Sequence, residues 1–319
     1  MVPGRPLARL LAGATIVTIA LGALALADDR APGFSVAVLR RDGLLIPFAD
    51  YDGKRWRRIW PDPADRVDVP IDLRNVPSKW WGRSGPHDNW QLWQPPREPR
   101  LLHVRQPNWV KAQCRQQIGL QTDYRPDIPP PPPQVQPYPK DGLAVAPPQP
   151  VEAIEVLPPG SPPEPVIDAF NDAEGAAMRD ELAQNGPTAA LPETRVRERT
   201  MPKVEAIYAV GDPVDTRVYY FELSKTYTDE RRECAVVAFG AGWFVRERMS
   251  PLRRLRFDVS IGDCERYGFL YMLPLGAMQL SNKLFWIAQW SGWDYEEYGI
   301  VEIKPKEIED VVRAAGGQC

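Results

Sequence analysis

Proline is concentrated in one part of this chain, and that concentration limits what the chain can fold into. The 319 residues include 36 prolines, and 16 of these lie between positions 125 and 165, with an unbroken run from Pro129 to Pro133. Proline lacks an amide hydrogen and has a fixed φ, so a segment this rich in it is unsuited to helices and sheet interiors. We therefore expect 125–165 to be an extended linker without helix or strand. A ligand for a proline-recognition module is the alternative interpretation.

The region before this linker shows the pattern of short antiparallel strands. Its turn signals are Asp42-Gly43 and Asp52-Gly53, because an Asp-Gly pair between apolar runs supplies the positive φ of a tight hairpin. No repeat of regular period accompanies the strands, which argues against a regular propeller. The strands expected here are 34–39, 44–48, 55–60, 69–73 and 100–105.

The region after the linker combines two expected helices with further strands. An amphipathic helix is predicted at 167–184, and the polar stretch from there to Pro202 is expected to be a loop. The spacing of Ile308, Val311 and Val312, followed by Gly316-Gly317, predicts a short C-terminal helix at 306–315. The strands expected between these helices are 205–210, 216–223, 234–239, 255–261, 267–273, 277–280, 283–290 and 298–303.

Together these elements predict a mainly β fold. It consists of two antiparallel β regions, each a sandwich, an open barrel or propeller-like, joined by the proline-rich linker, with one mid-chain helix and a short C-terminal helix. The two regions are either separate modules or one sheet system closed across the linker, and the sequence gives no oligomeric state. The expected segments are a leader at 1–27, a Trp-rich β region at 28–124, the linker at 125–165, a helix and connector at 166–202, and a β region with its terminal helix at 203–319.

The first 27 residues predict export. Arg5 and Arg9 precede an apolar run that ends in Ala25-Leu26-Ala27, and this order of basic segment, apolar core and small-x-small site is typical of a cleaved signal peptide. An uncleaved anchor is the alternative, because about 18 apolar residues can just span a bilayer. We therefore expect a periplasmic or extracellular protein that keeps no membrane span after cleavage.

An exported chain with four cysteines can form disulfides. The strands expected next to Cys234 and Cys264 flank a turn candidate at Met249, and in an antiparallel hairpin centred on Met249 these two cysteines face each other. Directly opposed Cβ atoms lie about 4.5–5.5 Å apart, close to disulfide reach. We therefore expect the bond Cys234–Cys264, with Cys114 and Cys319 either paired or free.

Charge and side-chain chemistry argue against several classes of function. Acidic and basic residues nearly balance, 42 against 39, without the basic surplus of a nucleic-acid binder. The two histidines, His87 and His103, lie in no nucleophile motif, and no CxxC pair exists, so no metal or cofactor site is expected. Asp50 and Asp52 have the spacing of calcium-loop ligands, but Pro61 stands where that loop needs a glutamate. We therefore interpret the two aspartates as part of a hairpin turn.

Tryptophan is the residue type that most favours a binding function. From Trp80 to Trp93 it occurs among glycine and proline, which predicts an ordered loop. Tryptophans there can form flat apolar surfaces for a sugar, a peptide or a protein, although they can equally fill the end of a β domain as core. The candidate ligand-binding residues are Trp80, Trp81, Trp90, Trp93 and Trp293.

Carboxylates near Trp293 give the catalytic alternative. Asp294, Glu296 and Glu297 lie among aromatic residues, as the paired carboxylates of glycosidases do. On a strand, however, Glu296 and Glu297 point to opposite faces, which makes them a poor catalytic pair, so we assign no catalytic residue. The expected function is a non-enzymatic binding or structural module of the cell envelope, with a carbohydrate or an envelope protein as partner. The alternative is a secreted hydrolase that acts on polysaccharide.

Overall fold

The computed structural model describes residues 33–64, 72, 74, 76–82, 85–132, 134–185, 191–229 and 232–319. Residues 31–319 form one compact unit, which is mainly antiparallel β, as predicted. The predicted leader at 1–27 lies outside the described residues, and so does the predicted strand at 69–73 except for Asp72.

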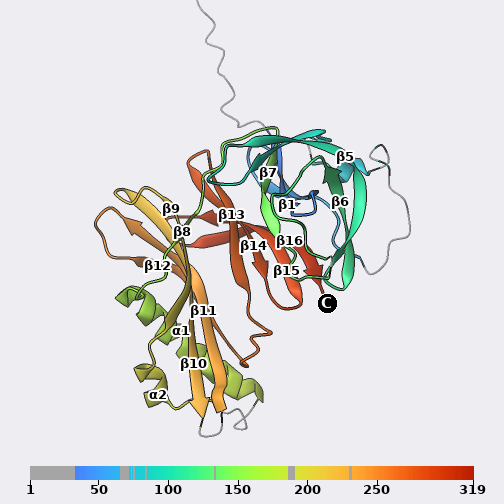
Figure 1. Ribbon diagram of the computed structural model, residues 1–319. Coiled ribbons are helices and arrows are strands. Elements are labelled where there is room, and N and C mark those ends of the chain that lie inside the picture. The colour runs from blue at the N-terminus through green and yellow to red at the C-terminus, as the bar shows by residue number, and fades with distance from the viewer. Residues whose placement is uncertain are drawn as a thin grey trace, which may run out of the picture. The chain divides into compact units, whose positions relative to one another are not determined.

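Six strands of the first region close into a barrel (Figure 1). They are β1 (Phe34–Arg40), β2 (Leu44–Tyr51), β4 (Asn89–Trp93), β5 (Arg100–Ala112), β6 (Arg115–Thr122) and β7 (Lys140–Ala146). Their order is β1-β7-β4-β5-β6-β2, and β1 also pairs with β2, which closes the sheet. A short strand, β3 (Trp56–Arg58), extends from β2, and the 3₁₀ turn η2 (Ser78–Trp80) precedes β4.

Both predicted Asp-Gly turns are confirmed. Gly43 and Gly53 have φ values of 81° and 89°, which glycine adopts without a Cβ clash. The carboxylate of Asp52 accepts hydrogen bonds from the backbone N–H groups of Lys54 and Arg55 at 3.1 and 3.0 Å. Asp52 therefore stabilises a turn, as the interpretation against a calcium loop required.

The prediction that 125–165 contains no helix or strand is wrong, because strands at 140–146 and 155–157 lie in this segment and a helix begins at Glu164. Strand β7 lies inside this segment and pairs with β1 on one side and β4 on the other. The stretch Lys140–Ala146 contains no proline, and Leu143 and Val145 are fully buried. The prolines flank this apolar strand and do not interrupt it, so the average composition of the window concealed it.

The prediction of a loop from Trp80 to Trp93 is also wrong for the last residues of that stretch. The last residues of that stretch form β4, where Trp90 and Leu92 are each 1% exposed and belong to the barrel core. Their period-two spacing directs both side chains to one face of the strand.

A five-stranded sheet and two helices form the second part of the fold. The strands are β8 (Glu155–Leu157), β9 (Lys203–Gly211), β10 (Thr216–Asp229), β11 (Arg232–Glu247) and β12 (Arg253–Gly262), in the order β12-β11-β10-β9-β8. Helix α1 (Glu164–Asn185) confirms the predicted mid-chain helix and lies along this sheet (Figure 1). A second helix, α2 (Thr194–Arg199), occupies part of the stretch expected to be a loop. Phe170 of α1 packs against Phe257 of β12 with ring centroids 6.1 Å apart.

A four-stranded sheet completes the fold. Its strands are β13 (Tyr271–Leu280), β14 (Lys283–Ser291), β15 (Tyr295–Ile303) and β16 (Ile308–Gln318), paired in sequence order. Phe48 of the barrel contacts Tyr298 of β15, with ring centroids 5.7 Å apart. Trp243 of the five-stranded sheet contacts Trp286 of β14, with centroids 4.9 Å apart. The four-stranded sheet therefore shares apolar clusters with both other parts.

The predicted C-terminal helix is wrong, because that segment forms strand β16. Ile300 faces Val312 whereas Val301 faces Asp310, so Val311 is an extra residue in the ladder. Such a bulge shifts the alternation of side chains by one position. The shift places apolar residues at positions 308, 311 and 312, a spacing that imitates one face of a helix.

The structure contains two disulfides, one of which was predicted and one of which the sequence left open. Cys234–Cys264 is confirmed, with Cα atoms 6.1 Å apart, and Cys114–Cys319 joins the β5–β6 turn to the residue after β16. Beside the turn, Val245 faces Arg253, as in a hairpin centred on Met249, but a bulge at Leu255 then shifts the register by one residue. Cys264 lies beyond the end of β12, so the pairing of β11 with β12 does not fix the direction of its side chain. The bond therefore forms in spite of the shifted register.

Candidate functional site

Two aromatic side chains, Tyr267 and Trp293, are exposed next to each other. Tyr267 is 49% exposed and Trp293 is 67% exposed. Their ring centroids lie 4.8 Å apart, with the ring planes at 63°. Large aromatic side chains are usually well buried, so two exposed rings in contact are a candidate surface for a ligand. We call Tyr267 and Trp293 the aromatic pair.

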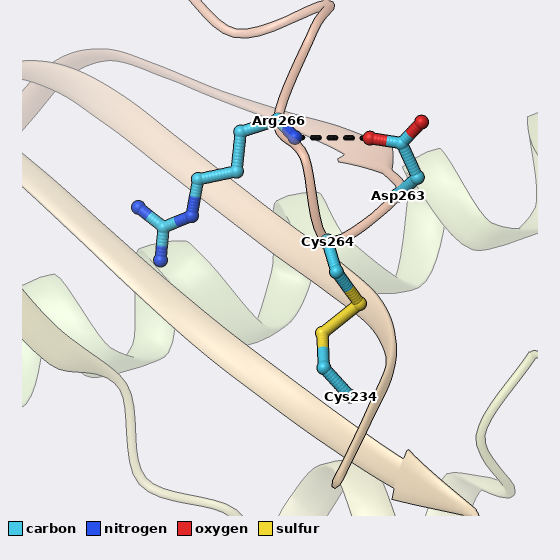
Figure 2. Close-up of a disulfide and its surroundings, with 4 residues drawn as sticks. All are labelled: Cys234, Asp263, Cys264 and Arg266. Atoms are coloured by element: carbon cyan, nitrogen blue, oxygen red, sulfur yellow. Dashed lines mark hydrogen bonds between the residues drawn. A yellow bond between two sulfur atoms is a disulfide. The ribbon is translucent and has the colours of Figure 1, made fainter. Parts of the chain in front are cut away.

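Tyr267 belongs to the loop 263–270, which joins β12 to β13. Near the start of the loop, the disulfide Cys234–Cys264 fastens it to β11 (Figure 2). The carboxylate of Asp263 accepts a hydrogen bond from the backbone N–H of Arg266 at 2.9 Å (Figure 2). This bond closes a tight turn directly before Tyr267.

Side chains on either side of Tyr267 anchor the same loop. The guanidinium of Arg266 donates to a carboxylate oxygen of Glu205 at 2.7 Å and to the hydroxyl of Tyr271 at 3.0 Å. Phe269 is 1% exposed and stacks on Phe239, with ring centroids 5.2 Å apart. The loop therefore presents Tyr267 from a fixed support, which reduces the entropy that a ligand would have to remove.

Trp293 lies in the short connection 292–294 between β14 and β15. The backbone N–H of Gly292 donates to the carbonyl of Tyr295 at 2.8 Å, and the N–H of Cys319 donates to the carbonyl of Asp294 at 2.9 Å. A Cβ atom on Gly292 would lie 3.0 Å from the backbone oxygen of Phe269. Glycine thus permits the close approach of the two loops that brings the aromatic pair together.

A cleft of about 220 Å³ adjoins the loop that carries Tyr267. Gly268 and Leu270 of that loop contribute to its wall, so the cleft begins beside the aromatic pair. We call it the charged cleft because of the ionic side chains in its lining. It is lined by Tyr220, Phe239, Ala241, Gly242, Trp243, Arg256, Asp258, Ser260, Gly268, Leu270, Trp290, Glu297 and Arg313.

Two arginines and three carboxylates form a chain of ion pairs along the charged cleft. Arg256 contacts Asp258 at 3.3 Å and Asp310 at 3.1 Å. Arg313 contacts the same Asp310 at 2.9 Å and Glu297 at 3.2 Å. Both arginines therefore share Asp310, which holds the planar guanidinium groups in place.

Ionisation around the cleft follows from these contacts. Burial acts to raise the pKa of Asp310, but hydrogen bonds from Arg313 and Arg256 outweigh it and hold that pKa below its usual value. The hydroxyl of Tyr295 donates to Glu297 at 2.6 Å. Burial, together with this carboxylate, raises the pKa of Tyr295 to about 12. Near neutral pH, Asp310 is therefore an ionised carboxylate that holds the two arginines of the cleft, and the hydroxyl of Tyr295 that contacts Glu297 is protonated.

The five predicted tryptophans do not form one site. Trp81 and Trp90 are 6% and 1% exposed and belong to the barrel core, and Trp80 is partly buried against the same core. Trp93 lines a different cleft, of about 420 Å³, together with Tyr124, Lys140 and Leu273. Of the five, Trp293 alone lies in the site described here.

The carboxylates predicted near Trp293 lie in separate surroundings. Glu296 is buried beside Lys140 at 2.8 Å and accepts a hydrogen bond from the hydroxyl of Tyr298 at 2.5 Å. Glu297 binds Arg313 and Tyr295 in the charged cleft. Each carboxylate thus has its own partners, as expected for neighbouring residues on opposite faces of a strand.

Neither histidine lies at the aromatic pair or in the lining of the charged cleft. His87 packs against Trp90 with ring centroids 5.7 Å apart, and a ring nitrogen of His103 lies 2.5 Å from the side-chain oxygen of Asn89. Within the described ranges, no group of three or more His, Cys, Asp or Glu side chains is arranged to hold a metal ion. In the same part of the chain, no helix has the length and apolar character needed to cross a bilayer.

The sequence did not single out Tyr267 or four members of the ion-pair chain, which are Arg256, Asp258, Asp310 and Arg313. The expected strand at 267–273 hid Tyr267, because it placed this residue inside a strand and not in the preceding loop. The signal that identifies the loop is the predicted disulfide itself, since a chain that leaves a bonded hairpin end must turn before it can start a new strand. Arg256 and Arg313 lack any local signal, because the pairing of distant strands brings them together.

Comparison with known proteins gives no relative from which a function could be transferred. No protein-family model matches the chain. No curated protein and no solved structure matches it either.

Proposed function

We propose that this protein is an exported, non-enzymatic binding module of the cell envelope and that its ligand is a carbohydrate. The observation that carries the proposal is the 67% exposure of Trp293 beside Tyr267, at the edge of the charged cleft. Exposure of an aromatic side chain to water is unfavourable in free energy, and a ligand that covers the side chain would offset this cost.

The combination of an aromatic pair and a charged cleft suits a sugar. The apolar C–H face of a pyranose ring stacks on an indole or phenol, while its hydroxyl groups need planar partners that accept or donate two hydrogen bonds at once. Asp258, Glu297 and the two arginines are partners of that kind, and ion pairs already orient them. A purely apolar ligand would make no use of the hydrogen-bonding capacity that these groups have beyond their ion pairs.

The hydrolase alternative has less support. A glycosidase needs two carboxyl groups about 5–9.5 Å apart on either side of one bond, and one of them must be protonated to act as the acid. Glu296 and Glu297 have separate partners. Asp258 and Glu297 each already form an ion pair with an arginine.

Export rests on the predicted signal peptide together with the disulfides. Two disulfides are consistent with an oxidising compartment. Within that compartment, envelope glycans are the carbohydrates that the protein would meet first.

A glycan array and sedimentation with insoluble cell-wall polysaccharide test the proposal. We expect the full chain to bind at least one glycan, and Trp293→Ala to weaken that binding about fivefold or more, because a stacked aromatic residue contributes about 1–3 kcal/mol. Tyr267→Ala should weaken it less, since Tyr267 is the less exposed member of the pair.

Met249→Ala is the matched control. Met249 is 96% exposed and lies in the turn between β11 and β12, outside the aromatic pair. Binding of no glycan, or equal binding by the Trp293 and Met249 variants, would reject the proposal. Release of new reducing ends from the bound glycan would favour the hydrolase instead.

A further inference from the structure

Strand β12 has an open edge. It is the last strand of the five-stranded sheet and pairs with β11 on one side. Among the described residues, no strand pairs with its other side. Every second residue of an edge strand turns its N–H and C=O groups outward, and an extended segment of another chain can pair with them.

The edge of the four-stranded sheet at β13 is protected, in contrast to β12. The N–H of Met272 donates to the carboxylate of Glu222 at 2.6 Å, and Ala277 exchanges two backbone hydrogen bonds with Glu152 at 2.7 and 2.9 Å. Pro274 supplies no N–H group. No comparable backbone contact to the outer edge of β12 occurs in the described part of the chain. The fold thus blocks one edge and leaves the other accessible.

A groove of about 430 Å³ lies between β12 and α1. Small side chains, Ala173, Ala176 and Ala177, form its α1 side, and Phe257 and Val259 are on its β12 side. A further strand would lie about 4.8 Å from β12. Alanine methyl groups leave room beside α1 for the side chains of such a strand.

The groove carries a net negative charge. Asp172 and Asp180 of α1 line it together with Asp258 and Arg254 of β12, which gives three carboxylates and one guanidinium. Arg254 lies 3.9 Å from Asp172. A basic group on a ligand would complement the remaining acidic charge.

We propose that this groove binds an extended segment of a partner protein, which joins the five-stranded sheet as a strand beside β12. Backbone hydrogen bonds to β12 supply most of the affinity, and the groove selects the side chains. Side chains at alternate positions of the segment lie next to Phe257, Val259 and the alanines of α1, so they are apolar and small or medium in size. A lysine or arginine of the segment lies near Asp180.

The groove and the charged cleft lie on opposite sides of β12. Phe257 and Val259 pack with the apolar cluster under α1, whereas Arg256 and Ser260 line the charged cleft. Successive residues of a strand point to opposite faces. Asp258 lines both sites, so the substitutions that test either site leave this residue unchanged, and loss of one site leaves the other available for measurement.

Selection of short random peptides against the full chain tests the proposal. We expect the enriched peptides to alternate apolar and polar residues and to carry lysine or arginine. N-methylation of every second amide in an enriched peptide removes those N–H groups. Either the odd-numbered or the even-numbered amides can be methylated. Methylation of the set that faces β12 should weaken binding at least tenfold, and methylation of the set that faces away from β12 should have little effect.

Variants on α1 locate the binding. Ala177→Phe places a ring in the groove and should also weaken binding at least tenfold. Arg179→Phe is the matched control, because Arg179 is exposed on α1 outside the groove lining. Asp180→Asn should weaken only those peptides that carry a basic residue, and unfolding curves check that each variant is folded. Selection without enrichment, equal effects of methylating either set of amides, or full binding by Ala177→Phe would each overturn the proposal.

Discussion

The carboxylate of Glu222 on β10 accepts a hydrogen bond from the backbone N–H of Met272 on β13 at 2.6 Å. This contact joins the five-stranded sheet to the four-stranded sheet through a side chain that is 2% exposed. Burial raises the pKa of Glu222 from 4.5 to about 7; the Met272 N–H opposes this rise, and the charge of Glu205 adds to it.

We expect ionisation of Glu222 to destabilise the folded protein. The pKa of Glu222 is higher in the folded state than in the unfolded state. The contribution of its protonated carboxyl to the stability of the fold is therefore complete below about pH 4.5 and is lost as the pH rises through about 7. The shift corresponds to about 3 kcal/mol. Denaturant unfolding across this range should show Glu222→Gln gaining stability relative to the unsubstituted protein as the pH rises. A stability difference that stays constant with pH would contradict this assignment.

Lys225 makes a second buried polar connection, between β10 and the helices. Its ammonium group contacts Glu174 of α1 at 2.9 Å, Asn171 at 2.8 Å and the backbone carbonyl of Arg197 in α2 at 3.0 Å, and its side chain is 0% exposed. We expect Lys225→Met to reduce the free energy of unfolding by about 3–5 kcal/mol, because Glu174 remains buried without its counter-charge.

The matched experiment for Lys225 is a double-variant cycle. Adding Glu174→Gln to Lys225→Met removes the second charge and keeps an acceptor for the hydroxyl of Tyr227, which donates to Glu174. The double variant should therefore be more stable than Lys225→Met alone, as measured by denaturant unfolding. If the second substitution adds a further loss, the buried charge is not the source of the cost.

Local chemistry accounts for the parts of the fold that the sequence predicts. Gly43 and Gly53 mark hairpins because a tight turn needs their positive φ, and this requirement is visible in two adjacent residues. Strand β7 escaped prediction because its prolines lie outside the strand. Strand β16 was hidden by its bulge at Val311, which only the pairing with β15 reveals.

The candidate site was predictable only in part, for a similar reason. Trp293 could be selected by residue type and by its carboxylate neighbours. The partner Tyr267 comes from another loop, and their contact depends on how β12, β13 and β14 pack. Arg256 and Arg313 share Asp310 across two sheets. Contacts between distant segments leave no pattern in either local sequence, so these residues required the structure.

Export gives a prediction that can be checked without knowing the ligand. The small-x-small site at Ala25-Leu26-Ala27 predicts that the mature chain begins at Asp28. N-terminal sequencing of protein recovered from the envelope or the medium should read from Asp28. An intact Met1 in the membrane fraction would support an uncleaved anchor instead.

Cys234–Cys264 is expected to stabilise both the fold and the aromatic pair. The two cysteines are 30 residues apart, and closing a loop of that length stabilises the folded state by about 3–4 kcal/mol through the unfolded chain. Cys264→Ser should therefore lower the melting temperature and leave Cys234 open to alkylation. It should also weaken glycan binding, because the loop 263–270 loses its attachment to β11 beside Tyr267.

The comparison with Lys225→Met separates these two effects of the disulfide. That variant is expected to lose a similar amount of stability through contacts with α1 and α2, and it leaves the loop 263–270 unchanged. At a temperature where both variants are folded, Cys264→Ser should bind the glycan more weakly than Lys225→Met does. Cys234→Ser should reproduce the effect, since it removes the same bond. Equal binding by all three variants would mean that Arg266 and Phe269 hold Tyr267 in place without the disulfide.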